Sequence, residues 1–587
     1  LMKLYIKYLT IGLMATTMLA SCADILDKKP LTEISDNDLW SDPALLKAFV
    51  NSRYNQVGVN GAESMQSSIV DETELTWLRG CETHNFARLS PTDLGRMNGA
   101  WWGWDNRSWS TKWTNISNCN IFFERVDNVG FTDEKEKTKL VGQVRFIRAF
   151  EYWDLIARWG AMPIITKSFS INDREEIVDQ KRNTYKECID FLVGELDQAA
   201  KELPANWSGD DYGRATSVAA LALKSRILLY AASPLMNEDV KIPEVGYTTP
   251  EPDRWQKAAK AATEALDAAQ AAGYELYNLD GDPSKNYQMI FMDNTAANKE
   301  TLFARMGTNS AGGESISSCD QYNNPNGYGG WGGNCPLQEL VDAYEVVKDG
   351  VASKFDWNNP EEKANPYANR DPRFYATILY DGAKWMTRNV ETYFDVDSNG
   401  NITGGGKDTK FGNDSWNASP TGYNMKKFMD EGYALNSWNF CARNWIHLRM
   451  AELYLNKAEA LYNIGDEEGA REALKPVRER AGMPAITAAG ADLLEAIKHE
   501  RRIELAFEEH RYFDVRRWKE APKYFGSTVH AITIKKYPDG KKTYEVDKLR
   551  SDVGGDRKWD DKMYWLPITK AEMDKNPNFV QNPGYNK

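Results

Sequence analysis

The chain has 587 residues, of which 42% are hydrophobic and 12% aromatic. This composition excludes wholesale disorder, and the length indicates several subdomains, since one domain typically holds about 100–200 residues. The net charge of −13 argues against nucleic acid as a partner, because phosphate binding needs basic stripes on the surface.

The first residues have the features of a lipoprotein signal peptide. Lys3 and Lys7 precede an apolar run over residues 8–20, which is too short to cross roughly 30 Å of hydrocarbon as a helix. The run ends in Leu19-Ala20-Ser21-Cys22, the order of a bacterial lipobox. We therefore expect residues 1–21 to be removed and Cys22 to carry a lipid anchor. The alternative is an ordinary signal peptide with a cysteine after it by coincidence.

Amphipathic helices dominate the sequence that follows. Ser41-Asp42-Pro43 combines a capping side chain with proline in the first turn, and predicts a helix over residues 44–56. Apolar residues at helical spacing predict a helix over 136–159, which Gly160 ends. The same spacing predicts further helices over 107–128, 184–202, 215–232 and 254–272.

The clearest helical hairpin is predicted over residues 445–481, where alanine, leucine and aromatic residues lie on both sides of Gly465-Asp466. This hairpin resembles a tetratricopeptide unit, although no strict repeat of about 34 residues persists. Two regions, 61–106 and 273–441, are rich in polar residues, glycine and aromatics, and predict irregular loops on a helical base. In the tail, short strands are expected over 530–535, 542–546 and 563–566.

Several contiguous motifs stand out in the sequence. The most specific runs from Glu500 to Trp518 and contains ERRIELAFE followed by RYFDVRRW. Others are Trp109-x3-Trp113, Val144 to Tyr152, Pro336 to Tyr344, and Asn582-Pro583-Gly584-Tyr585. Together these motifs resemble those of the SusD/RagB family of outer-membrane nutrient-uptake lipoproteins. The resemblance implies a mainly α fold of tetratricopeptide-like helical pairs with loop-rich ligand-binding elaborations and small β-hairpins. It implies a helical part over 22–272, a loop-rich ligand-binding part over 273–441, and helical hairpins with a tail over 442–587.

The resemblance also implies a function. Family members bind glycans at the cell surface and deliver them to a SusC-like TonB-dependent transporter in the outer membrane, over which they sit as a lid. They are not enzymes, and we expect no cofactor. Two alternatives stay open: a surface glycoside hydrolase, which needs two carboxylates about 5–10 Å apart, and a structural lid without a ligand of its own.

Aromatic residues in the two loop regions are the candidates for sugar contacts, because a flat ring can cover the apolar face of a sugar. Trp101, Trp102 and Trp104 lie in a glycine-containing loop. Adjacent side chains of an extended loop point opposite ways, so we expect one of them to face ligand while another packs. The alternative is that all three belong to the core, as we expect for Trp109 and Trp113.

The second candidate loop, 307–335, carries Tyr322, Tyr328 and Trp331 among asparagines and glycines. Its only charged residues are Glu314 and Asp320, which favours a neutral oligo- or polysaccharide as ligand. The alternative is a mobile surface loop with incidental aromatics.

Two polar residues complete the candidate site. Asp71 is expected to accept hydrogen bonds from sugar hydroxyls, and Arg370 to donate to them. The alternative for each is a surface cap or an ion pair within a turn.

Other patterns fail as metal or catalytic motifs. His499-Glu500 lacks a second histidine at position 503, and no metal is expected. Asp395-x-Asp397-x-Asn399-Gly400 starts like a calcium loop but has Gly406 at the twelfth position, so a β-turn is predicted. The Glu/Arg run over 500–517 is interpreted as a buried lattice of ion pairs. Cys319 and Cys335 flank the second loop, and free thiols are favoured over a disulfide bond.

Overall fold

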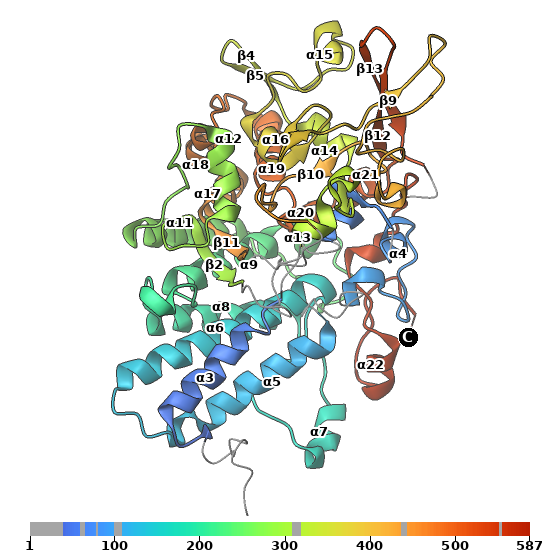
Figure 1. Ribbon diagram of the computed structural model, residues 1–587. Helices are drawn as coiled ribbons and strands as arrows, with labels where there is room; N and C mark the ends of the chain where they lie inside the picture. The colour runs from blue at the N-terminus through green and yellow to red at the C-terminus, as the bar shows by residue number, and fades with distance from the viewer. Residues whose placement is uncertain are drawn as a thin grey trace, which may run out of the picture.

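The computed structural model describes residues 39–58, 65–77, 80–98, 108–307, 319–435, 443–550 and 554–586. Helices make up most of its regular structure, and the strands form small sheets of two or three. Figure 1 shows the long N-terminal helices at one end of the molecule and the loop-rich part, with its short strands, at the other. The predicted mainly α fold is therefore confirmed. No helix within these described ranges is both long and apolar enough to cross a membrane.

The helical base is a stack in which each helix packs on the next along the chain. Its members are α5 (Trp109–Arg125), α6 (Glu134–Trp159), α8 (Tyr185–Glu202), α9 (Ser217–Ala232), α11 (Arg254–Ala271), α17 (Met450–Asn463) and α18 (Glu467–Arg480). Such neighbour-to-neighbour packing is typical of helical repeat proteins, because each pair buries its apolar face only against the next pair. The predicted tetratricopeptide-like arrangement is thus present, with the loop-rich part inserted between α11 and α17.

The ends of these helices follow from local sequence. Helix α3 (Pro43–Tyr54) starts at Asp42, whose carboxylate accepts a hydrogen bond from the Ala44 amide at 2.7 Å. Helix α6 ends at Gly160, whose φ of 81° disfavours other residues; a side chain there would also meet the Glu244 carbonyl. Short-range signals therefore predicted these boundaries correctly.

The predicted start of the helical hairpin at residue 445 is wrong. Residues Trp445–Arg449 form β11, which pairs antiparallel with β2 (Thr301–Arg305), and the helix α17 begins only at Met450. The strand depends on a partner far away in the sequence, which helical spacing within one segment does not reveal. The turn of the hairpin is as predicted, since Asp466 caps α18 by accepting from the Gly469 amide at 2.8 Å.

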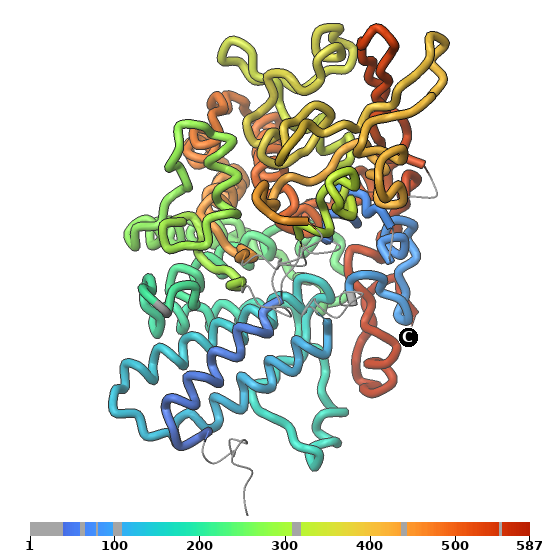
Figure 2. The backbone as a smooth tube through the Cα atoms, in the orientation of Figure 1, coloured from blue at the N-terminus to red at the C-terminus, as the bar shows by residue number. Residues whose placement is uncertain are grey.

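The loop-rich part contains short elements that hold distant segments together. Its helices are α12 (Pro283–Met292), α13 (Cys319–Asn323), α14 (Gln338–Ala343), α15 (Pro360–Ala364) and α16 (Pro372–Thr377). Strand β1 (Thr73–Leu75) pairs antiparallel with β3 (Asn334–Pro336), which ties an early loop to the later one. Figure 2 shows the blue trace of this early segment lying apart from the N-terminal helices, beside the red C-terminal tail.

The tail agrees with prediction in part. Strands β12 (His530–Lys536) and β13 (Lys542–Lys548) form an antiparallel hairpin. The strand predicted over 563–566 is wrong, because Asp561–Tyr564 form a 3-10 turn that Asp560 caps through the Lys562 amide at 3.1 Å. The predicted boundaries between the three parts of the chain stay predictions.

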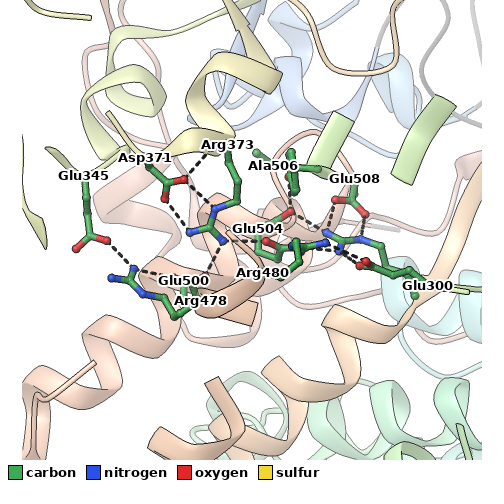
Figure 3. A network of polar contacts seen from close by, with 12 residues as sticks. Glu300, Glu345, Asp371, Arg373, Arg478, Arg480, Glu500, Glu504, Ala506 and Glu508 are labelled. Carbon is green, nitrogen blue, oxygen red and sulfur yellow. Dashed lines mark hydrogen bonds and ion pairs between the residues drawn. The ribbon is translucent and has the colours of Figure 1, made fainter. Parts of the chain in front are cut away.

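The Glu/Arg motif forms the predicted lattice of buried ion pairs (Figure 3). It spans α19 (Gly490–Glu504) and the loop that leads to α20 (His510–Arg517). Arg373 contacts Glu500 at 2.6 Å and Glu504 at 2.8 Å, and all three side chains are fully buried. The lattice joins the loop-rich part to the helical hairpins, since Arg373 lies in α16 and Arg480 in α18. Removing one partner of such a pair destabilises the fold, because the other charge is then buried without compensation.

Candidate ligand-binding site

Four predicted residues lie outside the described residues: Cys22, Trp101, Trp102 and Trp104. Lipidation of Cys22 and ligand contact by the tryptophans stay predictions. The neighbouring Trp109 is buried, as expected of a core residue, and Trp113 is half-buried and packs edge-on against Tyr152 at 5.8 Å between ring centroids.

Four aromatic side chains from three distant segments form one cluster, which we call the aromatic shelf: Trp77, Tyr322, Trp331 and Trp416. Trp331 lies 4.9 Å from Tyr322 and 6.2 Å from Trp77 between ring centroids. Trp77 in turn lies 6.0 Å from Trp416. Tyr322 is buried, Trp77 and Trp331 are half-buried, and Trp416 is 63% exposed. The cluster therefore runs from the interior to an open tryptophan at the surface.

Backbone hydrogen bonds hold the loop that carries Trp331. The Trp331 amide donates to the Gln321 carbonyl at 3.0 Å, and the Thr76 amide donates to the Gly333 carbonyl at 3.0 Å. The second bond continues the β1–β3 pairing and places Trp77 next to this loop. The described part of the loop is thus anchored on both sides, which argues against incidental aromatics in a mobile loop.

The glycines of this loop permit close packing. A Cβ atom on Gly332 would lie 2.3 Å from the Asn417 carbonyl oxygen, and one on Gly330 would lie 2.2 Å from that of Asn324. Gly332 also has a φ of 73°, which disfavours a side chain. The loop 324–333 can therefore lie directly against the segment that carries Trp416.

Asparagines position that neighbouring segment. The side-chain Nδ2 of Asn326 donates to the backbone carbonyls of Thr409 and Asn413 at 3.1 and 2.7 Å. The Asn417 side chain accepts a hydrogen bond from the indole of Trp77 at 3.2 Å. These contacts hold the chain just before the short turn Ser415–Asn417 and the last residue of that turn, which bears Trp416. The exposed ring of Trp416 is thus presented by a fixed turn.

Tyr328 belongs to a different set of contacts. Its hydroxyl donates to the carbonyls of Trp385 and Arg388 at 3.2 and 3.0 Å. The Arg388 guanidinium lies over the ring at 3.8 Å and is paired with Asp408 at 2.7 Å. One face of Tyr328 is therefore already covered by a cation, and none of these contacts joins it to the aromatic shelf.

Asp71 lies in the interior and its carboxylate is engaged by arginines. Arg511 donates two hydrogen bonds to it, both at 2.8 Å, and Arg502 approaches to 2.9 Å. Burial by itself would raise the pKa of Asp71, but the two guanidinium groups outweigh it and lower the pKa to about 2. The expected exposed acceptor is thus an internal ion pair, and we leave Asp71 out of the site.

Arg370 is also internal. Its guanidinium donates to the carbonyls of Val341, Tyr344 and Pro366, and so it binds the free carbonyls at the end of α14. The side chain is almost fully buried. Both polar candidates are therefore buried structural contacts, and neither is the ligand-binding group nor the surface group that the sequence suggested.

The remaining sequence patterns have structural roles. Asp397 accepts from the backbone amides of Asn399 and Asn401, both at 2.9 Å, which confirms the predicted turn. Cys319 and Cys335 are separate buried thiols. In the part of the chain that the structure describes, no group of three or more His, Cys, Asp or Glu side chains is arranged to hold a metal.

Two shelf residues were not predicted. Trp416 is a lone aromatic among Gly, Asn, Asp and Ser, the same signal that marked Trp331, and could have been selected on that basis. Trp77 lies two residues after the end of a buried strand, and no sequence pattern distinguishes it from a core residue. Its role depends on the pairing of β1 with β3.

Comparison with known proteins adds a family context. Residues 290–585 match the model of the SusD family, and residues 26–229 match a family described as starch-binding associating with outer membrane. A solved SusD-like protein from Bacteroides fragilis is 31% identical over 95% of this chain and 100% of its own, with a TM-score of 0.75.

More distant relatives extend the likeness. SusD-like protein P2 of Formosa agariphila is 25% identical, and the match covers 99% of this chain and 100% of the relative. A SusD-like carbohydrate-binding protein from Bacteroides fragilis shares the fold, with a TM-score of 0.69 and 23% identity over 92% of this chain and 99% of its own.

Proposed function

The chain belongs to the SusD family, and from this premise we propose that it binds a neutral oligo- or polysaccharide through the aromatic shelf. We propose further that it acts outside the cell on the outer membrane, anchored by lipid at Cys22, and passes its ligand to a SusC-like TonB-dependent transporter. The support for this delivery role is the family membership and the lipobox-like sequence, while the support for binding is the shelf itself.

The observation that carries the proposal is the exposed Trp416 held beside Trp77 and Trp331. Covering one face of a sugar removes on the order of 50 Å² of apolar surface from water, which stabilises the complex by roughly 1 kcal/mol. One ring alone gives weak binding, so several rings at neighbouring positions are needed for useful affinity. The shelf offers such a series, and its uncharged rings suit a neutral glycan.

Isothermal titration calorimetry against a panel of neutral polysaccharides tests the proposal. The variant Trp416→Ala should weaken binding of the recognised glycan by about fivefold, which corresponds to roughly 1 kcal/mol. Trp559→Ala is the control, because Trp559 is a half-buried tryptophan of the tail that lies outside the shelf and whose indole donates to Asp561 at 2.9 Å. Equal affinities of Trp416→Ala and the unmodified protein would refute the role of the shelf.

The two alternatives give different results in the same experiment. A glycoside hydrolase would release reducing sugar from the bound glycan, which the proposal does not predict. A structural lid would retain the transporter partner but bind no glycan of the panel. Absence of heat with every polysaccharide would therefore favour the lid over the binding protein.

A further inference from the structure

A second cleft lies on the helical base, built from other elements than the aromatic shelf. Its volume is about 310 Å³, and its walls come from residues 206–216, 272–274 and 296–306. These are the connection between α8 and α9, the end of α11, and the segment that enters and follows β2. We call it the side cleft. Clefts for small ligands begin at roughly 300 Å³, so this one has room for one or two sugar rings.

Three half-buried aromatic rings line the side cleft: Trp207, Tyr212 and Tyr274. The indole of Trp207 donates to the Ala215 carbonyl at 2.8 Å, and the hydroxyl of Tyr212 donates to the Thr295 carbonyl at 3.0 Å. The hydroxyl of Tyr274 lies 3.5 Å from the Ala205 carbonyl. Because their polar atoms are bound to the backbone, the rings are held in place before any ligand arrives, and less entropy is lost on binding.

Two glycines that line the side cleft have open space beside them. Gly209 and Gly273 have φ values of 60° and 84°, and a Cβ atom on either would meet no heavy atom within 4 Å. In the loop 324–333 glycines permit close packing, whereas here the backbone conformation requires them and the volume beside them is left empty. At these two positions the wall of the cleft is backbone that carries no side chain.

Polar groups at the rim complement the rings. Asn206, Ser208 and Lys299 are exposed lining residues that offer an amide, a hydroxyl and an ammonium group. The charge of the lining Arg214 is balanced, because its guanidinium contacts Asp211 at 2.7 Å and Asn51 at 2.6 Å. Among the described residues that line the cleft, none is an aspartate or glutamate. Uncharged rings with hydroxyl-binding groups around them are the chemistry of a site for a neutral sugar.

We propose that the side cleft is a second carbohydrate-binding site, which takes a neutral pyranose unit or disaccharide against Trp207, Tyr212 and Tyr274. It shares no lining residue with the aromatic shelf, so the two sites bind independently. On a long glycan, two sites on one molecule raise the overall affinity through effective concentration, provided that the chain can reach both. The proposal does not depend on which glycan the shelf recognises.

Saturation-transfer NMR on the mature chain with maltose, cellobiose, lactose and mannobiose tests the proposal. The measurement uses a Trp416→Ala background, which weakens binding at the shelf, and the substitutions in the cleft then show which part of the signal comes from the cleft. We expect saturation transfer from the protein to at least one of these disaccharides. The added substitution Ala296→Trp should weaken that binding by on the order of tenfold, because Ala296 is an exposed lining residue and the indole fills the cleft without removing a packed side chain.

A second variant and a control separate binding from folding. Tyr212→Ala removes one wall and should also lower the affinity by several-fold, whereas Trp559→Ala should leave it unchanged. The midpoint of thermal unfolding is compared for every variant. The proposal is overturned if no disaccharide shows transfer in the Trp416→Ala background, or if Ala296→Trp and Tyr212→Ala bind as the background does. Weaker polysaccharide binding by Trp416→Ala alone tests the shelf, so failure of one site is distinguishable from failure of the other.

Discussion

The substitution Arg449→Met tests whether the buried lattice holds the loop-rich part to the helical hairpins. Every guanidinium nitrogen of Arg449 is engaged: it contacts Glu300 at 2.6 Å, and Glu504 and Glu508 at 2.7 Å. All these side chains are nearly or fully buried. Removing one partner of a buried ion pair costs about 3–5 kcal/mol, because the opposite charges stay in a medium of low dielectric constant.

The remaining contacts limit the loss. In the variant, Glu300 and Glu504 still form ion pairs with Arg480, and Glu508 still forms one with Lys427 at 2.8 Å. We therefore expect a destabilisation of about 3–5 kcal/mol, a large part of the roughly 5–15 kcal/mol that stabilises a typical domain. The denaturant slope of a chain of 587 residues exceeds the roughly 1–3 kcal/mol per M of small proteins, because more surface is exposed on unfolding, so the urea midpoint should fall by on the order of 1 M. Tryptophan fluorescence and far-UV circular dichroism measure this midpoint.

The pH dependence gives a sharper test of the same variant. Burial would raise the pKa of Glu504, but Arg480, Arg449 and Arg373 together lower it in the folded protein. Without Arg449 the pKa of this carboxyl rises, so protonation relieves part of the uncompensated charge as the pH falls. The destabilisation by Arg449→Met should hence be smaller at pH 5 than at pH 8.

A matched control lies in the same part of the protein. Arg471→Met removes a partly exposed arginine of α18 that pairs with Glu467 and Glu468 at the protein surface, where an ion pair contributes only about 0–1 kcal/mol. If Arg449→Met were no more destabilising than Arg471→Met, or if its effect grew at low pH, the account of the lattice would be wrong.

Two further predictions concern the segment around β1 and the loop beside it. Burial, and then the neighbouring Asp71, raise the pKa of Glu72 to about 8, above the unfolded value of about 4.3. The protonated carboxyl of Glu72 thus contributes its full stabilisation below about pH 4, and this contribution is lost as the pH rises through 8. Glu72→Gln should remove this loss of stability, which urea midpoints at pH 5 and pH 9 measure. An unchanged loss in the variant would contradict the assignment to Glu72. Gly332→Ala places a Cβ atom 2.3 Å from the Asn417 carbonyl at a φ of 73°, and should displace the Trp331 loop and weaken glycan binding by several-fold in calorimetry. Gly350→Ala is its control, since that glycine also has a positive φ, 77°, but meets no atom within 4 Å; equal effects of the two would mean that backbone strain, and not the contact with Asn417, is responsible.

Sequence patterns predicted the features that depend on neighbouring residues. Helix starts and ends follow from caps such as Asp42 and Asp466, whose side chains bind amides two or three residues away. The lattice of the Glu/Arg motif was predicted because its charges repeat at helical spacing and the motif matches the family. The family resemblance itself rests on such contiguous motifs.

Tertiary structure decided which polar and aromatic residues are available to a ligand. Asp71 and Arg370 were plausible surface groups until their partners, Arg511 and the carbonyls at the end of α14, were known. Trp77 joins the shelf only because β1 pairs with a strand more than 200 residues later. Residues 445–449 became a strand for the same reason.

The division has one physical cause. Capping, turn formation and helical amphipathicity depend on atoms a few residues apart, so the amino-acid order by itself determined the helical stack and the positions of its turns. Exposure of a ring and pairing of a buried charge depend on what a distant segment places beside them, and only the folded chain brought Trp416, Trp77 and Trp331 together at the surface.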